Sequence, residues 1–432
     1  MRPRHGSSER SGGRGDNPGI VFEEYSLKNG LRVILHRDAR TPLVHVTLWY
    51  HVGSKNEKAD QTGFAHLFEH MMFQGSQHVA KTEHFVRIQG IGGSVNATTG
   101  QDRTNYFQTI PREHLGLALW LEADRMRSLH VSAENYDNQR SVVREERRQR
   151  YDNAPYGLWF LTLLEMLFSG SPYAWGPIGD MAHLEASPLE QVQEFHRRYY
   201  VPNNATLVIA GDFDTNEARA MVEREFGDIL PGPPLERPAI VIPPMDETRR
   251  ATLYSRVPLP SVYLGFRTVP VGHGDTRPLD LLSIILTRGR SSRLKRDLVF
   301  SRQIAQSVGA YSHPMERVGM FVIASVAAPG RDHQELEEEL WRTLERSRVD
   351  PATDREMQGA LNRIHALHAT SMTRLHGVAD ALAFNSVLRG DPSLVNSLME
   401  EYHAVSPDDI QRVAHDYIHP DRAAILHYLP EA

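Results

Sequence analysis

Three side chains that could bind and use a metal ion lie within five positions of this chain. His66, Glu69 and His70 occur in the segment TGFAHLFEHMMFQG, residues 62–75. On a helix, two histidines four residues apart have side-chain roots about 5 to 6 Å apart, so both imidazoles can reach one Zn²⁺. Glu69 would then lie beside the ion and could take a proton from a metal-bound water that attacks a carbonyl. The alternative is that these residues form the solvated side of a helix.

The apolar residues around this motif follow the spacing of one buried helical face. They are Phe64, Leu67, Phe68, Met71 and Met72, at positions i, i+3, i+4, i+7 and i+8. The three polar residues fall on the opposite side, within roughly 100° of one another. That side carries no Lys or Arg, which favours a cleft over a surface in bulk water. Asp60 or Thr62 could cap the start of the helix, and Gly75 could end it.

A catalytic zinc usually has three protein ligands, so one further ligand is required. The segment ENYDNQRSVVREERRQRYDNAPYG, residues 134–157, contains two adjacent candidates. A helix there places Glu146 on a mainly apolar stripe and leaves Glu145 on the polar side. The stripe consists of Gln139, Val142, Val143 and Glu146. A carboxylate among apolar residues is costly unless it is paired or binds a cation, so Glu146 is the predicted third ligand. Pairing of Glu146 with a nearby arginine is the alternative.

The composition is that of a globular protein with room for two domains. The chain has 432 residues and a formal net charge of -6, with 48 basic and 54 acidic residues. These charges are dispersed along the chain and do not form the basic cluster that would indicate binding to nucleic acid or an anionic membrane. Because there is no cysteine, disulfides and thiolate zinc sites are excluded, and a metal must be held by His, Asp or Glu.

The N-terminal segment, residues 1–18, is rich in Arg, Ser and Gly and lacks the apolar core of a secretory signal. We expect a disordered tail, and Glu9 and Asp16 disfavour the alternative of a mitochondrial transit peptide. No apolar run is long enough to span a membrane. The expected location is therefore the cytoplasm, or the periplasm if an export signal was removed.

A proline-rich segment, residues 226–247, lies near the middle of the chain. Closely spaced prolines favour extended chain over helix or central strand, so the predicted linker lies here. The resulting division is a tail at residues 1–18, an N-terminal metal-binding domain at 19–232, a linker at 233–247 and a C-terminal domain at 248–432.

The two sides of the linker resemble each other in the order of their elements. Residues 42–53 and 260–272 are β-branched and aromatic runs that end in glycine, and each precedes a predicted helix. Matching the glycines that follow these helices, Gly75 and Gly289, sets three residues opposite the metal motif. They are Asp280, Ser283 and Ile284, opposite His66, Glu69 and His70 in turn. The pattern predicts a duplicated domain whose second copy has no metal-ligand set, and chance similarity is the alternative.

The metal motif, the distal Glu146 and further segments together resemble the inverted zinc metallopeptidases, the superfamily of pitrilysin, insulysin and mitochondrial processing peptidase. The further segments are residues 92–107, 142–157, 199–214 and 289–294. The resemblance covers nearly the whole chain after the tail. It implies an α+β fold of two homologous domains, each a mainly antiparallel sheet packed with helices, which together form half of a clamp-like peptidase chamber.

The resemblance also implies roles for individual residues. His66, His70 and Glu146 match the zinc ligands and Glu69 matches the general base. This implies a zinc-dependent endopeptidase that hydrolyses peptides or unfolded segments. Many members carry an acidic residue where this chain has Gln139, which could still hydrogen-bond a ligand or water but adds no charge.

A sharper departure lies in the C-terminal half. Many members carry an Arg and a Tyr that hold the substrate carbonyl near the zinc, and the matching positions here are Val299 and Gln306. Loss of an oxyanion donor typically lowers the rate by about 10² to 10³. The sequence therefore predicts the zinc-bearing subunit of a processing-peptidase-like heterodimer, whose homologous zinc-less partner supplies the pair. The alternative is a homodimer or monomer that uses other donors, such as Arg302 or Tyr311.

Peptide binding is predicted at residues 90–107, GIGGSVNATTGQDRTNYF, where glycines precede an alternating polar and β-branched run. This pattern indicates an exposed edge strand to which an extended peptide can add. Asn96 and Ala97 match the substrate strand of the superfamily and are the predicted contacts, with a structural role as the alternative.

Two rival functions fit the motif less well. A non-catalytic scaffold of the same fold predicts an eroded zinc motif, whereas all four residues are present here. A structural zinc site normally has four protein ligands.

Overall fold

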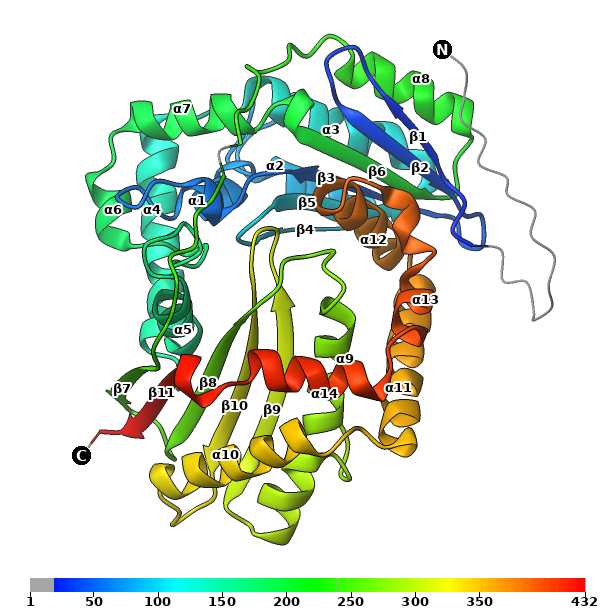
Figure 1. Cartoon of the computed structure of the whole chain (residues 1–432). Helices are drawn as coiled ribbons and strands as arrows, with labels where there is room; N and C mark the ends of the chain where they lie inside the picture. Colours follow the sequence, from blue (N-terminus) through cyan, green and yellow to red (C-terminus); the bar gives the residue numbers. More distant parts are fainter. Residues whose placement is uncertain (1–18, 238, 432) are drawn as a thin grey trace, which may run out of the picture.

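The computed structural model describes residues 19–237 and 239–431. The expected disordered tail, residues 1–18, lies outside the described residues. The described chain forms two β-sheets, each packed with helices, one above the other in Figure 1. This is the α+β fold expected from the sequence. No helix among the described residues is both long and apolar enough to cross a membrane.

The first sheet has six strands in the order β1-β2-β6-β3-β5-β4. Their bounds are β1 Glu23–Ser26, β2 Arg32–Arg37, β3 Leu43–Tyr50, β4 Ser94–Thr99, β5 Thr104–Pro111 and β6 Ala205–Gly211. All neighbours are antiparallel except β2 and β6. The central strands β3 and β6 are almost wholly buried, because helices cover both faces of the sheet at this point.

The second sheet repeats this arrangement with five strands in the order β7-β11-β8-β10-β9. Their bounds are β7 Arg249–Ser255, β8 Ser261–Thr268, β9 Ala305–Pro314, β10 Gly319–Ala327 and β11 Ala423–Pro430. Again one pair, β7 and β11, is parallel and the others are antiparallel. The order and directions match β2-β6-β3-β5-β4, so the predicted duplication is confirmed and β8 is the counterpart of β3.

The helices follow the same repeat. In the first half they are α1 Phe64–Met71, α2 Glu83–Gly90, α3 Leu115–Ser128, α4 Ala133–Arg147, α5 Trp159–Phe168, α6 Met181–Ala186, α7 Leu189–Tyr199 and α8 Thr215–Phe226. In the second half they are α9 Thr276–Thr287, α10 His333–Val349, α11 Asp354–Met372, α12 Leu375–Leu388, α13 Leu398–His403 and α14 Pro407–Tyr417. Helix α9 follows β8 as α1 follows β3, and α11 packs on α9 as α4 packs on α1.

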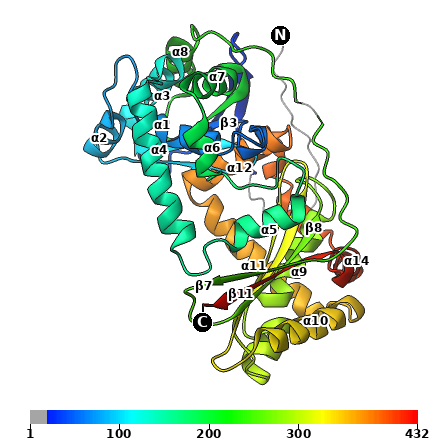
Figure 2. The same ribbon diagram turned by 90° about the vertical axis from the view of Figure 1, so that its left-hand side faces the viewer.

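One helix from each half packs on the sheet of the other half. Helix α5 packs on β8 and β11, where Leu163 and Leu167 join a core with Val322 and Leu426. Helix α12 packs on β3 and β6 through an apolar face that includes Leu382. Both exchanges can be followed in Figures 1 and 2. The predicted domain bounds, residues 19–232 and 248–432, therefore follow the order of the chain, and they stay a prediction.

The segment between α8 and β7 contains no helix or strand in its described part, residues 227–237 and 239–248. It runs along the first half, where Arg237 donates a hydrogen bond to Asn204 at 2.8 Å. This extended course agrees with the linker expected from its prolines.

A buried polar cluster joins the two halves at the turn between β9 and β10. Asp102 of the first half accepts hydrogen bonds from Lys55 at 2.9 Å, from Tyr173 at 2.7 Å and from the backbone N–H of Glu316 at 2.9 Å. The Glu316 carboxylate pairs with Lys55 and lies 2.5 Å from the imidazole of His51. Figure 1 shows this turn reaching the first sheet beside β4.

This cluster predicts a loss of stability in acid. Burial opposes ionisation of Glu316, but His51 and Lys55 outweigh it and lower the pKa of Glu316 to about 2 from an ordinary 4.5. Because the unfolded chain then binds the extra proton between pH 4.5 and 2, stability falls as the pH drops through that window. We expect Glu316→Gln to remove about 3 kcal/mol of this pH dependence in acid titrations of unfolding. Glu113→Gln, at an exposed residue without an ion pair among the described residues, should leave it unchanged.

Candidate metal centre

Helix α1 is held by the apolar face that the sequence predicts. Phe64, Leu67, Phe68 and Met71 are buried in the core of the first half. His66 is also buried, at 8% exposure, whereas Glu69 and His70 are half-buried. The three polar residues therefore do not form the solvated side of a helix.

The start of α1 is capped differently from the prediction. Neither Asp60 nor Thr62 caps it, because the first helical residue follows Gly63, which has a φ of 97° and no side-chain cap of its own. The buried carboxyl group of Glu57, whose pKa burial raises to about 8, accepts hydrogen bonds from the backbone N–H groups of Gly63 at 2.9 Å and Ala65 at 2.8 Å. The helix ends at Met71, four residues before Gly75. Sequence rules predict a cap from the residues next to the helix start, and Glu57 lies seven residues before Phe64, so these rules do not identify it.

Glu57 is thus expected to position α1. Replacing it with Gln turns an amide N–H₂ toward backbone donors, and each buried donor left unsatisfied costs about 1 to 3 kcal/mol. We expect Glu57→Gln to lower the thermal midpoint and the affinity for zinc, measured by unfolding with and without the metal. Asp60→Asn, in the same loop but exposed, should change neither value. Equal effects of the two variants would contradict this role.

Helix α4 brings Glu146 to the site, and the choice of Glu146 over Glu145 agrees with the geometry. Glu145 is exposed and accepts a hydrogen bond from Gln149 at 2.9 Å. Val143 is buried, but Val142 is 42% exposed, so the prediction that Val142 belongs to the buried stripe is wrong. The side of α4 that faces the protein runs through Tyr136, Gln139 and Val143, which are buried, to Glu146, which is half-buried.

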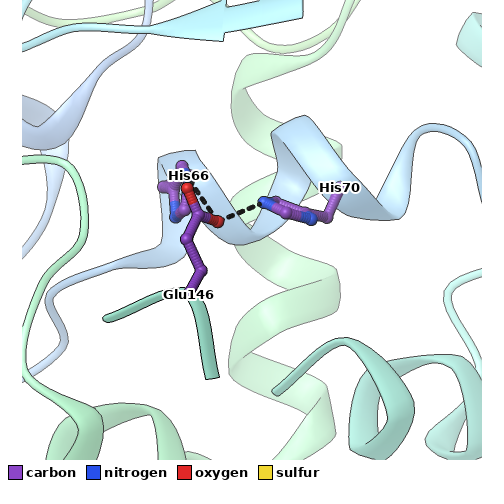
Figure 3. Close-up of side chains that lie close together, drawn as sticks. All are labelled: His66, His70 and Glu146. Carbon is purple, nitrogen blue, oxygen red and sulfur yellow. Dashed lines mark ion pairs between the residues drawn. The ribbon is translucent and has the colours of Figure 1, made fainter. Parts of the chain in front are cut away.

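Two imidazoles and one carboxylate converge at this point (Figure 3). Glu146 Oε2 lies 3.5 Å from His66 Nε2 and 3.1 Å from His70 Nε2. The three potential ligand atoms lie within 4.8 Å of one another, and no other group of three or more metal-ligating side chains occurs among the described residues. Ligand atoms bound to tetrahedral zinc at 2.0 to 2.1 Å are roughly 3.3 Å apart, so this donor set fits zinc.

The electrostatics of these groups suit a metal ligand set. Burial and the neighbouring His70 lower the pKa of His66 to about 4, so its imidazole is neutral near pH 7. The hydrogen bond from His70 lowers the pKa of Glu146, which keeps this carboxylate ionised. Burial raises the pKa of Glu69, which makes it a stronger base than an exposed glutamate.

The alternative of an arginine partner for Glu146 is also present in the structure. Arg150 Nη1 lies 2.6 Å from Glu146 Oε1, while Oε2 faces the histidines. Arg150 is largely exposed at 74%, so this pair contributes little by itself. The two interpretations are compatible, because each uses a different carboxylate oxygen.

The predicted substrate residues lie on β4, which is the edge strand that the sequence predicts. Asn96 is exposed and accepts a hydrogen bond from the N–H of Ala97, whose side chain is buried. Gln139 is buried and donates to Asn138 at 2.9 Å, with no described hydrogen bond to a ligand. The roles of Asn96, Ala97 and Gln139 stay predictions.

The positions that match the Arg and Tyr of the superfamily, and the two alternative donors, have the following contacts in the structure. Gln306 is exposed on β9, and Val299 packs at the edge of the second core. Arg302, one proposed substitute, pairs with Glu339 at 2.5 Å. Tyr311, the other, packs against Trp159, the first residue of α5. The use of Arg302 or Tyr311 as a donor stays a prediction.

Comparisons with known proteins agree with this architecture. Residues 32–174 match the family described as insulinase, peptidase family M16, and residues 188–364 match the peptidase M16 inactive domain. The zinc protease PqqE of Helicobacter pylori is 27% identical over 412 residues, which cover 94% of this chain and 93% of that protein. YmxG of Bacillus subtilis, named an uncharacterized zinc protease, is 24% identical over 409 residues, 94% of this chain and 98% of its own length.

A solved structure of a protease from Helicobacter pylori superposes with a TM-score of 0.91 at 27% identity, over 95% of this chain and 100% of that one. The fold and ligand set together define a class of duplicated α+β proteins with a metal-ligand set in one copy. The chain belongs to the M16 peptidase family, in the pitrilysin-like superfamily.

Proposed function

We propose that this protein is a zinc-dependent metalloendopeptidase that hydrolyses peptides or unfolded segments. The observation that carries the proposal is the convergence of His66, His70 and Glu146, with Glu69 on the same helix as the histidines. Relatives named zinc proteases support it. The name of the C-terminal family, an inactive domain, agrees with a second copy that carries no ligand set.

The proposed roles follow from the geometry. His66 and His70 would hold zinc through Nε2 and Glu146 through Oε2, leaving a fourth position open. When bound, the metal would polarise a carbonyl and lower the pKa of water. Glu69, whose own pKa is raised by burial, would take the proton from the attacking water and later pass it to the leaving amine.

Substrate would bind by adding to the first sheet. Strand β4 is paired on one side only, and it packs beside α1. An extended peptide could therefore hydrogen-bond to its free edge, near Asn96 and Ala97, and pass beside Glu69. Backbone pairing tolerates many sequences, which suits a peptidase acting on unfolded chain.

The missing oxyanion donors support a heterodimer as the active form. A homologous zinc-less chain would supply Arg and Tyr where this chain has Val299 and Gln306. We expect the purified chain alone to cleave quenched peptides at least about 10²-fold more slowly than a mixture with that partner. Equal turnover by the chain alone would contradict the heterodimer but not the zinc site. A homodimer would then be the favoured form.

A further inference from the structure

A basic pocket lies between α9 and α11, outside the metal centre. It has a cavity volume of about 710 Å³ and is open to solvent. Four arginines line it, namely Arg288, Arg296, Arg355 and Arg363, together with one acidic residue, Glu356. The adjacent α9 and α11 are visible in Figure 1.

Most of the positive charge of this pocket is unpaired among the described residues, although Arg296 lies 3.3 Å from Asp297. Glu356 is already bound by Arg293 in a two-point ion pair, at 2.7 and 2.8 Å. Arg288, Arg355 and Arg363 form no ion pair within the described ranges. Like charges gathered in one pocket attract an anion, and this chain otherwise has an acidic balance.

The pocket lies between two helices of the second copy that have counterparts in the first. Helices α9 and α11 are the counterparts of α1 and α4, which carry the metal ligands in the first half. Ile284, which lines the pocket, stands opposite His70 when Gly75 and Gly289 are matched. Asp280, which matches His66, accepts a hydrogen bond from the Tyr402 hydroxyl at 2.8 Å. The second copy thus has a charged pocket between the helices that correspond to α1 and α4, next to the position that matches His70.

The spacing of the arginines favours an extended ligand over a single phosphate. Arg355 and Arg363 are eight residues apart on α11, which is about 12 Å along the helix. An extended peptide rises about 3.3 Å per residue, so two carboxylates about four residues apart could reach both arginines. Ile284, Ile285 and Ala360 provide an apolar floor against which such a chain can lie.

We infer that this pocket binds an acidic segment of the peptide substrate, away from the bond that is cleaved. The inference rests on the proposed function for the identity of the ligand as a peptide. It makes acidic, extended peptides the favoured substrate class of the protein.

The test uses fluorescence anisotropy with two labelled peptides of about twelve residues, one with Glu at every fourth position and one with Gln there. The full chain carrying Glu69→Gln is used, so that binding is measured without cleavage. We expect tighter binding of the Glu peptide. Each of Arg288→Ala, Arg355→Ala and Arg363→Ala should weaken it about two- to fivefold, and the triple variant at least about tenfold. Arg256→Ala, at a residue 95% exposed outside the pocket, is the matched control.

Equal binding of the two peptides would overturn the inference, as would equal weakening by Arg256→Ala. Tripolyphosphate is a further probe. If it binds in a way that depends on these arginines while the Glu peptide shows no preference, the pocket is a phosphate site and the inference is wrong. If the wild-type chain with zinc, alone or with its partner, cleaves neither peptide while Glu69→Gln still prefers the Glu peptide through these arginines, the peptidase proposal alone is rejected, because anisotropy requires no turnover.

Discussion

Replacing Glu69 with Gln should lower peptide turnover by about 10² to 10⁴-fold while leaving the zinc content unchanged. The side chain lies between the two histidines in sequence but does not belong to the converging ligand set. Glutamine has nearly the same size and cannot accept the proton, so the fold and the metal should be kept. The measurements are cleavage of a quenched peptide and zinc per chain by elemental analysis.

The matched control for this prediction is Glu145→Gln. Glu145 is an exposed carboxylate on α4, next to the proposed ligand Glu146. Its loss should leave both turnover and zinc content within about twofold, as for most surface changes. Undiminished turnover in Glu69→Gln would reject this residue as the base. Absence of turnover in the wild type, with or without a partner, would favour the scaffold alternative.

Removal of a proposed ligand should have a larger effect. His70→Ala deletes one of three donors, and zinc affinity should fall by well over the 10- to 100-fold that loss of a group supporting a ligand typically causes. Turnover should fall below detection at zinc concentrations that saturate the wild type. Binding to the folded state also stabilises it, by about 4 kcal/mol at zinc concentrations 1,000 times the Kd. The zinc-induced rise in the unfolding temperature should therefore be absent in His70→Ala.

Glu146→Gln should behave like His70→Ala in this test, because Glu146 Oε2 is the third converging atom. His78→Ala provides the control, since His78 lies outside that ligand set. Retention of zinc by Glu146→Gln with the wild-type thermal shift would show that the third ligand has been misassigned. Glu146 would then be only the partner of Arg150.

Much of the candidate metal centre could be predicted from local spacing. The apolar face of α1 and the opposite placement of His66 and Glu69 depend only on helical geometry, which the sequence encodes directly. The preference for Glu146 over Glu145 followed from the cost of a carboxylate on a buried face. The edge position of β4 was predictable because glycines and alternating polar residues precede a strongly buried strand.

Other features depend on contacts that local spacing does not encode. Glu57 caps α1 from an upstream loop. Sequence rules for helix caps consider only residues next to the helix, so they predict Asp60 or Thr62 instead. The exchange of α5 and α12 pairs each helix with a sheet far away in sequence. The exposure of Val142 shows that an apolar residue beside a buried stripe need not belong to it.

The most direct test of the zinc-peptidase account is a titration of the metal-free chain with zinc, with cleavage of a quenched peptide followed in the presence of the homologous partner. We expect no cleavage before zinc is added, and activity that rises and saturates at one zinc per chain, because the described residues contain one set of three ligand side chains. The same titration of Glu69→Gln should show equal zinc binding and at least about 10²-fold less cleavage. Cleavage by the metal-free chain, or zinc bound at one per chain without any cleavage, would contradict the account.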